Sequence, residues 1–482
     1  MIPVTLTEVA RDCEGTFRAG GSPSVVADDV VTALTTDTRT IAGGEVFAAI
    51  KGERIDGSTL AGDALSAGAR AVLTADPEVA AASGADPERI IAVPDVRQAI
   101  GKLARANLAR ARSRGNPDLR VVAVTGSVGK TTTKDLLAAL LAPRGQIIAP
   151  PGSLNNELGL PLTVLRAGQD TATLVLEMGA DHVGNIDYLT SIAPPDVAVV
   201  LAVARAHLGE FGGIDNVARA KSELVTGTRE GGTVILNADD ERVAAMAQLA
   251  RGPVVTFSAS GDGDVAARNV ALGADGRASF DLAVRVGGSL AREGEGGARV
   301  SLRLVGEHHV SNALAAAAAA LAVGADLADV CAALGETAAA SPHRMDVFEC
   351  EGATIVDDSY NANPDSMRAG LAALAKLGED RRRVAILGEM LELGEATEAE
   401  HASLGRCVAD AGVAALVCLG SATAATARSA RQAGVHVHDA ADSDGALAAL
   451  RSILKPGDVV LLKGSNGSGV WRIADALRGE AK

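Results

Sequence analysis

The segment from Val121 to Lys134, VVAVTGSVGKTTTK, has the residue types and spacing of a phosphate-binding loop. Val121 to Val124 is a short apolar run typical of a buried strand. Gly126 and Gly129 allow a tight turn and a close approach of the backbone to a ligand. The amides that follow point out of a helix N-terminus, where the partial positive charge favours phosphate. The segment therefore predicts a site for a nucleoside triphosphate.

Each position of this loop has a predicted role. Lys130 supplies a full positive charge for the β- and γ-phosphates, and the Thr131 hydroxyl suits Mg²⁺. The glycines are closer together than in the common G-x-x-x-x-G-K-[ST] loop, and a plain helix N-terminal cap is the alternative. The apolar strand directly before the loop favours the nucleotide site. The predicted cofactor-binding residues of the loop are Thr125, Gly126, Ser127, Val128, Gly129, Lys130, Thr131 and Thr132.

The composition limits the classes of protein to consider. A chain of 482 residues suggests two to four domains, and 48% hydrophobic residues are enough for several cores. The formal net charge of −15 argues against a nucleic-acid partner, because phosphate backbones require basic patches. This negative net charge does not exclude a nucleotide site, where a few local cations suffice.

The cysteines and apolar runs predict a cytoplasmic protein. The five cysteines are odd in number and none is in a C-x-x-C arrangement, which fits reduced thiols. The N-terminus lacks a basic region followed by an apolar one, so we expect no signal peptide. The longest apolar run, Ala313 to Val323, is mostly alanine and too short to span a bilayer, which predicts a buried helix. We expect no membrane insertion and a monomer.

Alternating strand and helix patterns predict an α/β protein of three domains. Residues 1–96 form a small substrate domain, 97–340 a central ATP-binding domain with a mostly parallel sheet, and 341–482 a Rossmann-like C-terminal domain. Ser341 to Arg344 is the predicted linker. A Gly-rich stretch, 262–303, suggests an antiparallel insertion with strands at Ser279 to Val286 and Arg299 to Leu304.

Further sequence motifs indicate which class of nucleotide-binding protein carries this loop. In chain order they are SLNN at 153–156 with Gly159, Pro161 and Thr163, LEMGA at 176–180, AHL at 206–208, AKSEL at 220–224, NADD at 237–240, G-x-H at 306–308 with Asn312, and DDSYNANP at 357–364. This ordered set resembles the Mur ligases, the ATP-dependent amide-forming enzymes of peptidoglycan precursor synthesis. The resemblance covers nearly the whole chain.

Within that family the chain is most similar to members that join D-alanyl-D-alanine to UDP-N-acetylmuramoyl-tripeptide. The similar strings are DDSYNANPDSM, GEMLELGE at 388–395, and TDTRTIAGGEVFAAIKGERIDG at 36–57. The resemblance implies an acyl phosphate on a substrate carboxylate, which an amine then attacks. One alternative is a sister ligase adding a diamino acid, which should carry a DNPR-like motif that we do not find. The other is a P-loop switch that hydrolyses nucleotide to signal.

The resemblance implies a metal site and a modified lysine. Glu177 ends an apolar strand, where an acid is a reasonable Mg²⁺ ligand, although a solvated strand-end acid is as common. His207 would contribute to the metal site. Lys221 would be carbamylated by CO₂, which turns a cation into an anionic ligand or orienter for a second Mg²⁺. From the residues alone, Lys221 could equally be a surface lysine. Together with Lys130, these are the predicted catalytic residues.

The resemblance also implies nucleotide and substrate contacts. Asn312, Arg344 and Asp358 would contact the adenosine and phosphates, with Arg344 reaching ATP when the third domain closes. Residues near the UDP-sugar end would be Asp37, Thr38, Arg39, Lys51, Gly52, Asp56 and Gly57. Residues near the reacting carboxylate would be Asn155, Asn156 and Thr163, and those holding the incoming dipeptide would be Tyr360, Asn361 and Asn363.

Several positions depart from the pattern expected of the family. The departures are Ala202 and Ala204 for Asn and Gly, Asp181 and Asn185 for Asn and an acid, His309 for Asn, and Asn466 for Arg. The loop and the candidate metal ligands are intact, so we expect ATP chemistry to be retained.

Overall fold

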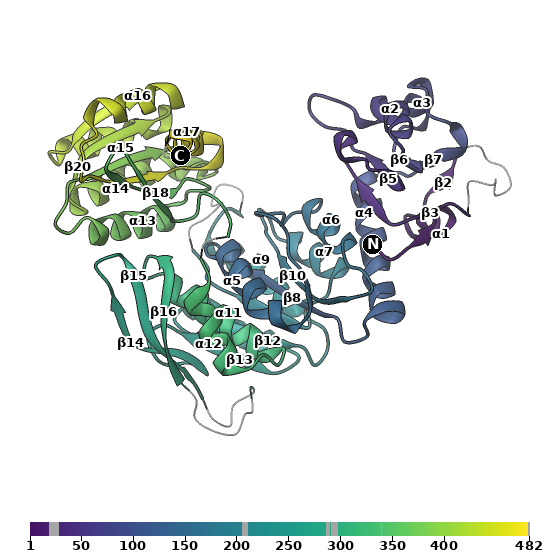
Figure 1. Cartoon of the computed structure of the whole chain (residues 1–482), viewed down its shortest axis with the longest axis horizontal. Coiled ribbons are helices and arrows are strands. Elements are labelled where there is room, and N and C mark those ends of the chain that lie inside the picture. Colours follow the sequence, from purple (N-terminus) through teal and green to yellow (C-terminus); the bar gives the residue numbers. More distant parts are fainter. Residues whose placement is uncertain (19–27, 205–210, 286–289, 291–296, 339, 481–482) are drawn as a thin grey trace. The chain divides into compact units, whose positions relative to one another are not determined.

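The computed structural model describes residues 1–18, 28–204, 211–285, 290, 297–338 and 340–480. Strands and helices alternate along the described chain (Figure 1), which confirms the α/β prediction. They form sheets of five, nine and six strands and a separate pair, β1 (Val4–Thr5) with β3 (Val30–Val31). Residue contacts group the chain in two compact units. The first unit is 1–123, 141–179 and 185–196; the second is 124–140, 180–184 and 197–482.

The N-terminal sheet of the first unit has four parallel strands and one antiparallel edge strand. Its order is β2 (Thr16–Phe17), β7 (Ile90–Ala92), β6 (Ala71–Thr74), β5 (Glu45–Ala49), β4 (Ala33–Thr35). The accompanying helices are α1 (Leu6–Asp12), α2 (Ala61–Ser66) and α3 (Pro77–Ala82). Because β4 and β5 are parallel neighbours, the loops that follow them leave the same edge of the sheet.

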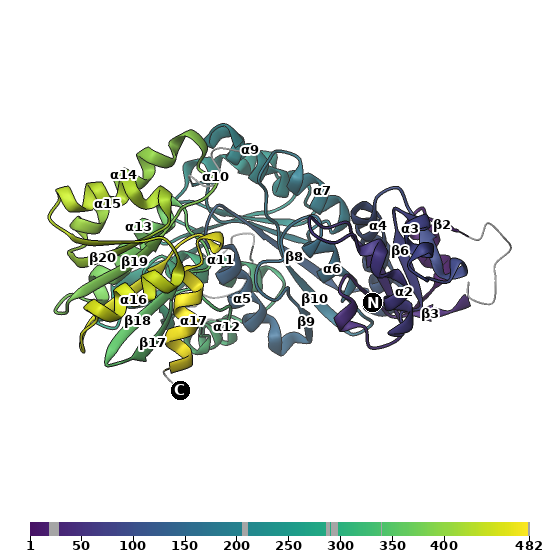
Figure 2. The same ribbon diagram turned by 90° about the horizontal axis from the view of Figure 1, so that it is seen from above.

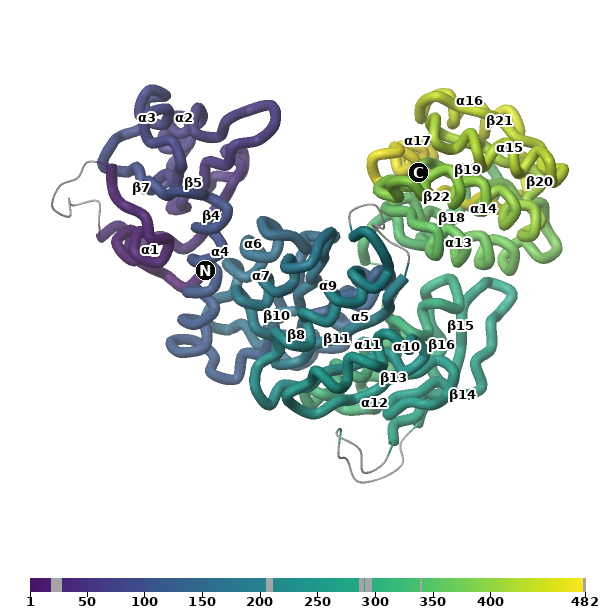
Figure 3. The backbone as a smooth tube through the Cα atoms, turned by 180° about the vertical axis from the view of Figure 1, so that it is seen from behind, coloured from purple at the N-terminus to yellow at the C-terminus, as the bar shows by residue number. Residues whose placement is uncertain are grey.

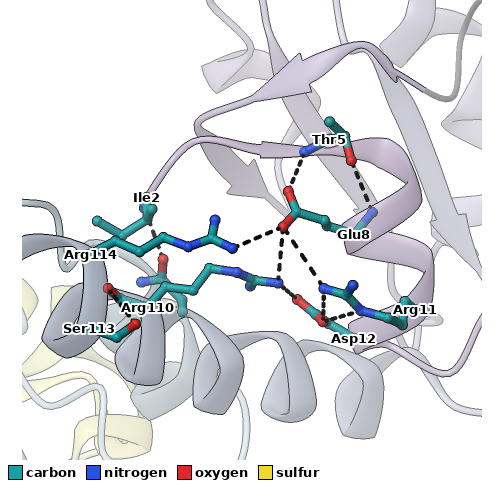
Figure 4. Close-up of polar contacts among 9 residues, drawn as sticks. Ile2, Thr5, Glu8, Arg11, Asp12, Arg110, Ser113 and Arg114 are labelled. Carbon is teal, nitrogen blue, oxygen red and sulfur yellow. Dashed lines mark hydrogen bonds and ion pairs between the residues drawn. The ribbon is translucent and has the colours of Figure 1, made fainter.

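Charged side chains connect α1 to the long helix α4 (Val96–Arg110), as Figure 4 shows. The Arg110 guanidinium pairs with the Asp12 carboxylate, and each side chain is only 9% exposed. Glu8 lies 3.9 Å from the same guanidinium. A buried pair of this kind is costly to break, since the remaining charge would have no compensation. The cluster therefore fixes the N-terminal helix against α4.

The nine-stranded sheet carries the phosphate loop. Its order is β16 (Gly297–Val305), β15 (Arg277–Val284), β14 (Val265–Leu272), β13 (Val254–Ser258), β12 (Thr233–Asn237), β11 (Val197–Val200), β8 (Arg120–Thr125), β10 (Thr171–Glu177), β9 (Gln146–Ile148). Its helices are α5 (Lys130–Leu141), α6 (Gly159–Leu165), α7 (Asn185–Ile192), α9 (Ile214–Thr226), α10 (Glu241–Ala244), α11 (His309–Ala322) and α12 (Leu327–Glu336).

The segment 262–303, where an antiparallel insertion is expected, contains the antiparallel pairs β14–β15 and β15–β16. The strands β14, β15 and β16 are antiparallel to one another, as expected, but they continue the central sheet (Figure 3). Strand β14 joins β13 in parallel register, Phe257 opposite Val265, so the sheet is extended rather than interrupted. Val286, the expected end of one strand, lies outside the described residues.

Helix α11 confirms the alanine-rich buried helix. The residues from Ala313 to Ala320 are fully buried. Small side chains allow a helix to lie close to its neighbours, which suits a position against a sheet. None of the helices in the described part of the chain is long and apolar enough to cross a membrane. All five cysteines are described and none forms a disulfide.

The C-terminal sheet has helices on both faces (Figure 2). Its order is β17 (Asp346–Cys350), β18 (Ala353–Asp358), β22 (Val459–Lys463), β19 (Arg383–Gly388), β20 (Val413–Leu419), β21 (His436–Ala440). Helices α13 (Pro364–Leu377), α14 (Thr397–Asp410) and α15 (Ala424–Gln432) pack into one core. Helices α16 (Ser443–Ile453) and α17 (Val470–Glu480) pack into another. Five of the six strands are parallel, as expected for a Rossmann-like domain.

Candidate nucleotide and ligase site

The phosphate loop lies in the second unit, between Thr125 at the end of β8 and Lys130 at the start of α5. Gly129 has a left-handed backbone (φ 82°), and a Cβ there would lie 2.3 Å from the Asn312 side-chain oxygen. No residue other than glycine fits that position. The turn is thus closed against α11, which supplies Asn312.

Backbone groups hold the loop to the segment that follows β11. The Ser127 amide donates to the carbonyl of Ala202 (2.9 Å). The Ser127 hydroxyl donates to the carbonyl of Ala204 (3.1 Å) and accepts from its amide (3.0 Å). Two of the departing positions, Ala202 and Ala204, therefore support the loop through main-chain atoms. These contacts do not depend on the side chains present there.

The NADD string at 237–240 also holds the segment that follows β11. The Asn237 side-chain amide donates to the carbonyl of Leu201 (2.9 Å), and Asp240 accepts from the amide of Val203 (2.8 Å). The NADD string contributes to the family resemblance, and its structural role could not be predicted from the sequence. His207 follows this segment but lies outside the described residues, so its predicted metal contact stays a prediction.

The loop fits a polyphosphate. The Lys130 ammonium donates to the carbonyl of Gly126 (2.7 Å), which keeps its charge over the loop. Thr131 and Thr133, in the first turn of α5, are buried, and Thr132 lines a pocket beside this turn. A cation and helix N-terminal amides together favour phosphate. Among the described residues, no cluster of three or more His, Cys, Asp or Glu side chains could hold a metal.

His309 supports Asn312 from within α11. The His309 Nδ1 lies 3.2 Å from the Asn312 side-chain nitrogen, and Asn312 Oδ1 lies 3.5 Å from the Thr133 hydroxyl. Burial lowers the pKa of His309 well below its usual value, so the ring is neutral. A neutral Nδ1 accepts from the Asn312 amide and directs its oxygen towards the loop. Nothing in the sequence indicated this support.

Arg344 lies beside α5, the helix that begins at the phosphate loop. The guanidinium lies over the Tyr360 ring, with Cζ 4.1 Å from the ring centre. Its side chain lines a small pocket with Thr132 and Asp135 of α5. The Nε atom is buried and has no hydrogen-bond partner among the described residues. The structure therefore brings Arg344, Tyr360 and the loop helix together within the second unit.

The charge of Asp358 is compensated by Lys463, a residue that is not among the predicted site residues. The Lys463 ammonium donates to the Asp358 carboxylate (2.6 Å) and to the carbonyl of Asn361 (3.0 Å). The two residues lie opposite each other at the ends of β18 and β22. This pair fixes the start of the loop that carries Tyr360 and Asn361.

The two asparagines of that loop have different surroundings. Asn361 is exposed, and among the described residues its side-chain oxygen accepts only from the next amide, that of Ala362 (2.8 Å). Asn363 caps α13: its side-chain oxygen accepts from the Ser366 backbone amide (2.8 Å), and its backbone amide donates to the Ser366 hydroxyl (3.0 Å). A capping side chain has a structural task. Asn361 is the better placed of the two to meet a ligand.

Lys221 is not a surface lysine. It lies on α9 with 3% of its surface exposed. Lysine is almost never buried this deeply unless its charge is compensated or removed. Burial therefore distinguishes Lys221 from an ordinary solvated lysine.

In the first unit, the SLNN loop surrounds Glu177. The Glu177 carboxylate accepts from the Ser153 hydroxyl (2.9 Å) and from the Asn155 amide (2.7 Å). Glu177 is 1% exposed at the end of β10. A buried carboxylate with two donors is a fixed acceptor rather than a solvated strand-end acid. The predicted Asn155 and Glu177 are thus in direct contact.

Asn156 and Thr163 have local tasks in α6. The Asn156 oxygen accepts from the amide of Gly159 (2.8 Å), at the start of that helix. The Thr163 hydroxyl is buried and donates to the carbonyl of Gly159 (2.9 Å). Their predicted substrate contacts stay predictions, and the hydrogen bonds indicate support of the helix.

The predicted UDP-sugar residues lie in the loops after β4 and β5. Asp37 caps a turn at Thr38–Thr40, and its hydrogen bonds from Arg39 lower the pKa of Asp37 to about 2. The backbones of Lys51 and Asp56 form an isolated antiparallel β-bridge across a tight turn that includes Gly52, and Gly57 follows it. The structure places both loops at one edge of the N-terminal sheet.

Comparisons with known proteins agree with this arrangement. The model described as "Mur ligase middle domain" matches residues 124–320, "Mur ligase, glutamate ligase domain" matches 343–466, and "Mur ligase family, catalytic domain" matches 30–108. The chain belongs to the Mur ligase family. The resemblance inferred from the sequence is confirmed, as is the three-domain α/β fold.

Individual Mur ligases are similar over the full length. UDP-N-acetylmuramoyl-tripeptide–D-alanyl-D-alanine ligase of Mycobacterium bovis is 43% identical over 99% of this chain and 98% of its own. A crystal structure of MurF from Acinetobacter baumannii matches with a TM-score of 0.85, at 30% identity and 99% of each chain. MurF ligase from Thermotoga maritima, solved in complex with ADP, has a TM-score of 0.77, at 27% identity over 94% of this chain and 98% of that one.

The remaining departures from the Mur ligase pattern are Asp181, Asn185 and Asn466. Asn185 begins α7 and donates to the Glu157 carboxylate. Asp181 is exposed beside His182. The carbonyl of Asn466 accepts from the Trp471 ring nitrogen (3.2 Å), a contact that does not use the side chain of residue 466. Nothing in the structure explains why Asn466 replaces Arg.

Proposed function

We propose that this chain joins D-alanyl-D-alanine to UDP-N-acetylmuramoyl-tripeptide, forming the UDP-linked pentapeptide, ADP and phosphate. The observation that carries the proposal is 43% identity over 99% of the chain to a ligase with that printed name. ATP use is a property of the family to which the chain belongs, and the phosphate loop fits it. The proposal adds the identity of the two substrates.

The reaction requires two bond-forming steps. An oxygen of the tripeptide carboxylate attacks the γ-phosphorus of ATP, and ADP leaves. The dipeptide amine then attacks the acyl carbon, a C–N bond forms, and phosphate leaves as the C–O bond breaks. Both steps concentrate negative charge on phosphate and carboxylate oxygens, so cations and backbone donors are more useful than a protein nucleophile.

The residues of the loop would bind and orient the phosphates. Lys130 and the amides from Gly126 to Thr132 would hold the β- and γ-phosphates, and Asn312 would contact the adenosine. Arg344 would meet the transferred phosphoryl group and exclude water from the acyl phosphate. Mg²⁺ would supply further charge neutralisation when bound by Thr131, Glu177, His207 and Lys221.

Carbamylation would give Lys221 a role in that metal site. The uncharged amine would add CO₂ and lose a proton, giving an anionic carbamate. The burial of Lys221 on α9 supports this proposal only in that it sets this side chain apart from a solvated surface lysine. Native mass spectrometry in bicarbonate buffer should show the added mass of one CO₂, absent in Lys221→Met. An unchanged mass in the wild-type protein would remove the carbamate from the proposal.

Phosphate release tests the function. We would measure release from ATP and Mg²⁺ with UDP-N-acetylmuramoyl-tripeptide, with and without D-alanyl-D-alanine. Release that needs both substrates and is lost in Lys130→Ala supports the ligase. Release with the UDP-linked peptide and a different amine indicates the sister ligase. Release without either substrate indicates the nucleotide switch.

A matched pair of glycine variants tests the loop geometry. Gly129→Ala should raise the KM for ATP at least about tenfold, because its Cβ would collide with Asn312. Gly434→Ala is the control, since Gly434 is also left-handed (φ 87°) but has open space around it. An unchanged KM in Gly129→Ala would contradict nucleotide binding at this loop.

We also propose a cytoplasmic location and a monomer. The reduced cysteines and the nucleotide-linked substrate support the location. Sedimentation of the purified chain tests the monomer, and a stable dimer would contradict it.

A further inference from the structure

The linker next to Arg344 has an unusual backbone. His343 (φ 61°) and Met345 (φ 53°), on either side of Arg344, both adopt left-handed conformations. Residues with a Cβ rarely do so, and the strain persists only where the surroundings hold it. Two such residues within three positions indicate that the direction of the intervening side chain is fixed.

A buried carboxylate holds His343. The His343 Nδ1 lies 2.8 Å from an oxygen of Asp357, which is fully buried on β18. An ionised carboxylate accepts only, so Nδ1 donates. The same Asp357 oxygen accepts from Arg478 (3.2 Å), and the other accepts from the Ser359 hydroxyl (2.6 Å). Asp357 is therefore itself fixed by several donors.

The main chain and the next residue add to this anchor. The carbonyl of His343 accepts from the amide of Tyr360 (3.1 Å), the residue whose ring lies against Arg344. Met345 is 4% exposed and belongs to the core that contains Val356 and Met367. Both neighbours of Arg344 are thus attached to the C-terminal sheet.

The side chain of Arg344 is therefore held in one orientation. Its guanidinium lies over Tyr360, its side chain lines the pocket beside Thr132 and Asp135 of α5, and its buried Nε has no partner among the described residues. A buried guanidinium nitrogen left without an acceptor is costly, so such an arrangement suits a site that receives an anion.

We propose that His343 is a positioning residue for the phosphoryl-transfer step: its bond to Asp357 and its left-handed backbone aim Arg344 at the phosphate loop. This inference rests on the proposed role of Arg344. It adds a residue that acts through Arg344 and makes no contact with substrate.

Substitutions at His343 separate the hydrogen bond from the backbone conformation. Asparagine tolerates a left-handed backbone, and its amide can donate where Nδ1 does, so His343→Asn should keep kcat close to that of the wild type. His343→Gly keeps the conformation and loses the bond, so kcat should fall about 10- to 100-fold with little change in the KM for ATP. Glu351→Ala is the control, because Glu351 is left-handed (φ 51°) but exposed between β17 and β18.

The deciding measurement is a double-mutant cycle on kcat with Arg344→Ala, with thermal unfolding measured for every variant. If His343 acts through Arg344, adding His343→Gly to Arg344→Ala causes no further loss. Additive losses, a lower melting temperature at unchanged kcat, or failure of asparagine to rescue would each overturn the inference. If Arg344→Ala alone leaves kcat unchanged, the proposed role of Arg344 fails first, which is a distinguishable result.

Discussion

Several polar side chains support the candidate site through contacts that their residue type alone does not predict. His309, a departure from the expected Asn, orients Asn312 because burial keeps its ring neutral. Lys463 compensates Asp358, and Ser127 attaches the phosphate loop to main-chain atoms. His309 lies three residues before Asn312 on α11, whereas Lys463 and Ser127 have their partners far away in the sequence. Such partners follow from the tertiary fold, which explains why local patterns did not reveal them.

His309 should make stability depend on pH. Its folded pKa lies below the ordinary 6.5, so the unfolded chain binds a proton that the native protein does not. Stability should therefore fall as the pH drops below about 6.5, by about 1 kcal/mol between pH 6.5 and 5.5. His309→Asn keeps an acceptor for Asn312 and removes this titration, so its loss of stability over that range should be smaller.

Urea unfolding at several pH values measures this difference. Equal pH dependence in the wild type and His309→Asn would contradict a neutral buried ring.

At the scale of elements, capping and ion pairs decide where helices begin and what they pack against. Asn363 with Ser366 forms a capping box at α13, a pattern that the sequence NPDS carries within four residues. The predicted contact of Asn363 with the dipeptide stays a prediction beside this capping role. The α1–α4 cluster could not be predicted in the same way, because Asp12 and Arg110 are distant in sequence. Apolar runs predicted β8 and α11 to within a few residues.

The α1–α4 cluster gives a prediction about stability. Asp12→Asn would leave the buried Arg110 charge without its nearest partner, so the first unit should lose about 3 kcal/mol of unfolding free energy. Arg11→Ala is the comparison, because Arg11 contacts the same carboxylate at 3.3 Å but is 66% exposed. It should cost no more than about 0.5 kcal/mol.

Hydrogen exchange of the α1 amides, together with urea unfolding, measures the two variants. Faster exchange should be confined to Asp12→Asn. Similar losses in both variants would show that burial of Arg110 does not set the strength of the pair.

For the whole molecule, the sequence was sufficient to predict the family and the α/β fold. The ordered strings span nearly the whole chain, and the phosphate loop is a local structure that its own residues define. The linker geometry was not predictable, since the left-handed His343 depends on Asp357 and Tyr360 across the C-terminal sheet. The substrate contacts assigned to Asn156, Thr163 and Asn363 came from family position, whereas their hydrogen bonds support helices.

A substitute amine can test the proposal that phosphoryl transfer and dipeptide binding depend on different residues. Hydroxylamine attacks acyl phosphates to give hydroxamates, so it can replace the dipeptide without using a dipeptide site. Asn361→Ala should raise the KM for D-alanyl-D-alanine about tenfold through loss of a hydrogen bond, while hydroxamate formation stays near the wild-type rate. Lys130→Ala should abolish both reactions, because the acyl phosphate never forms. If Asn361→Ala lowered hydroxamate formation as much as ligation, the exposed Asn361 would belong to the phosphoryl-transfer site. Dipeptide binding would then have to be sought elsewhere in the C-terminal domain.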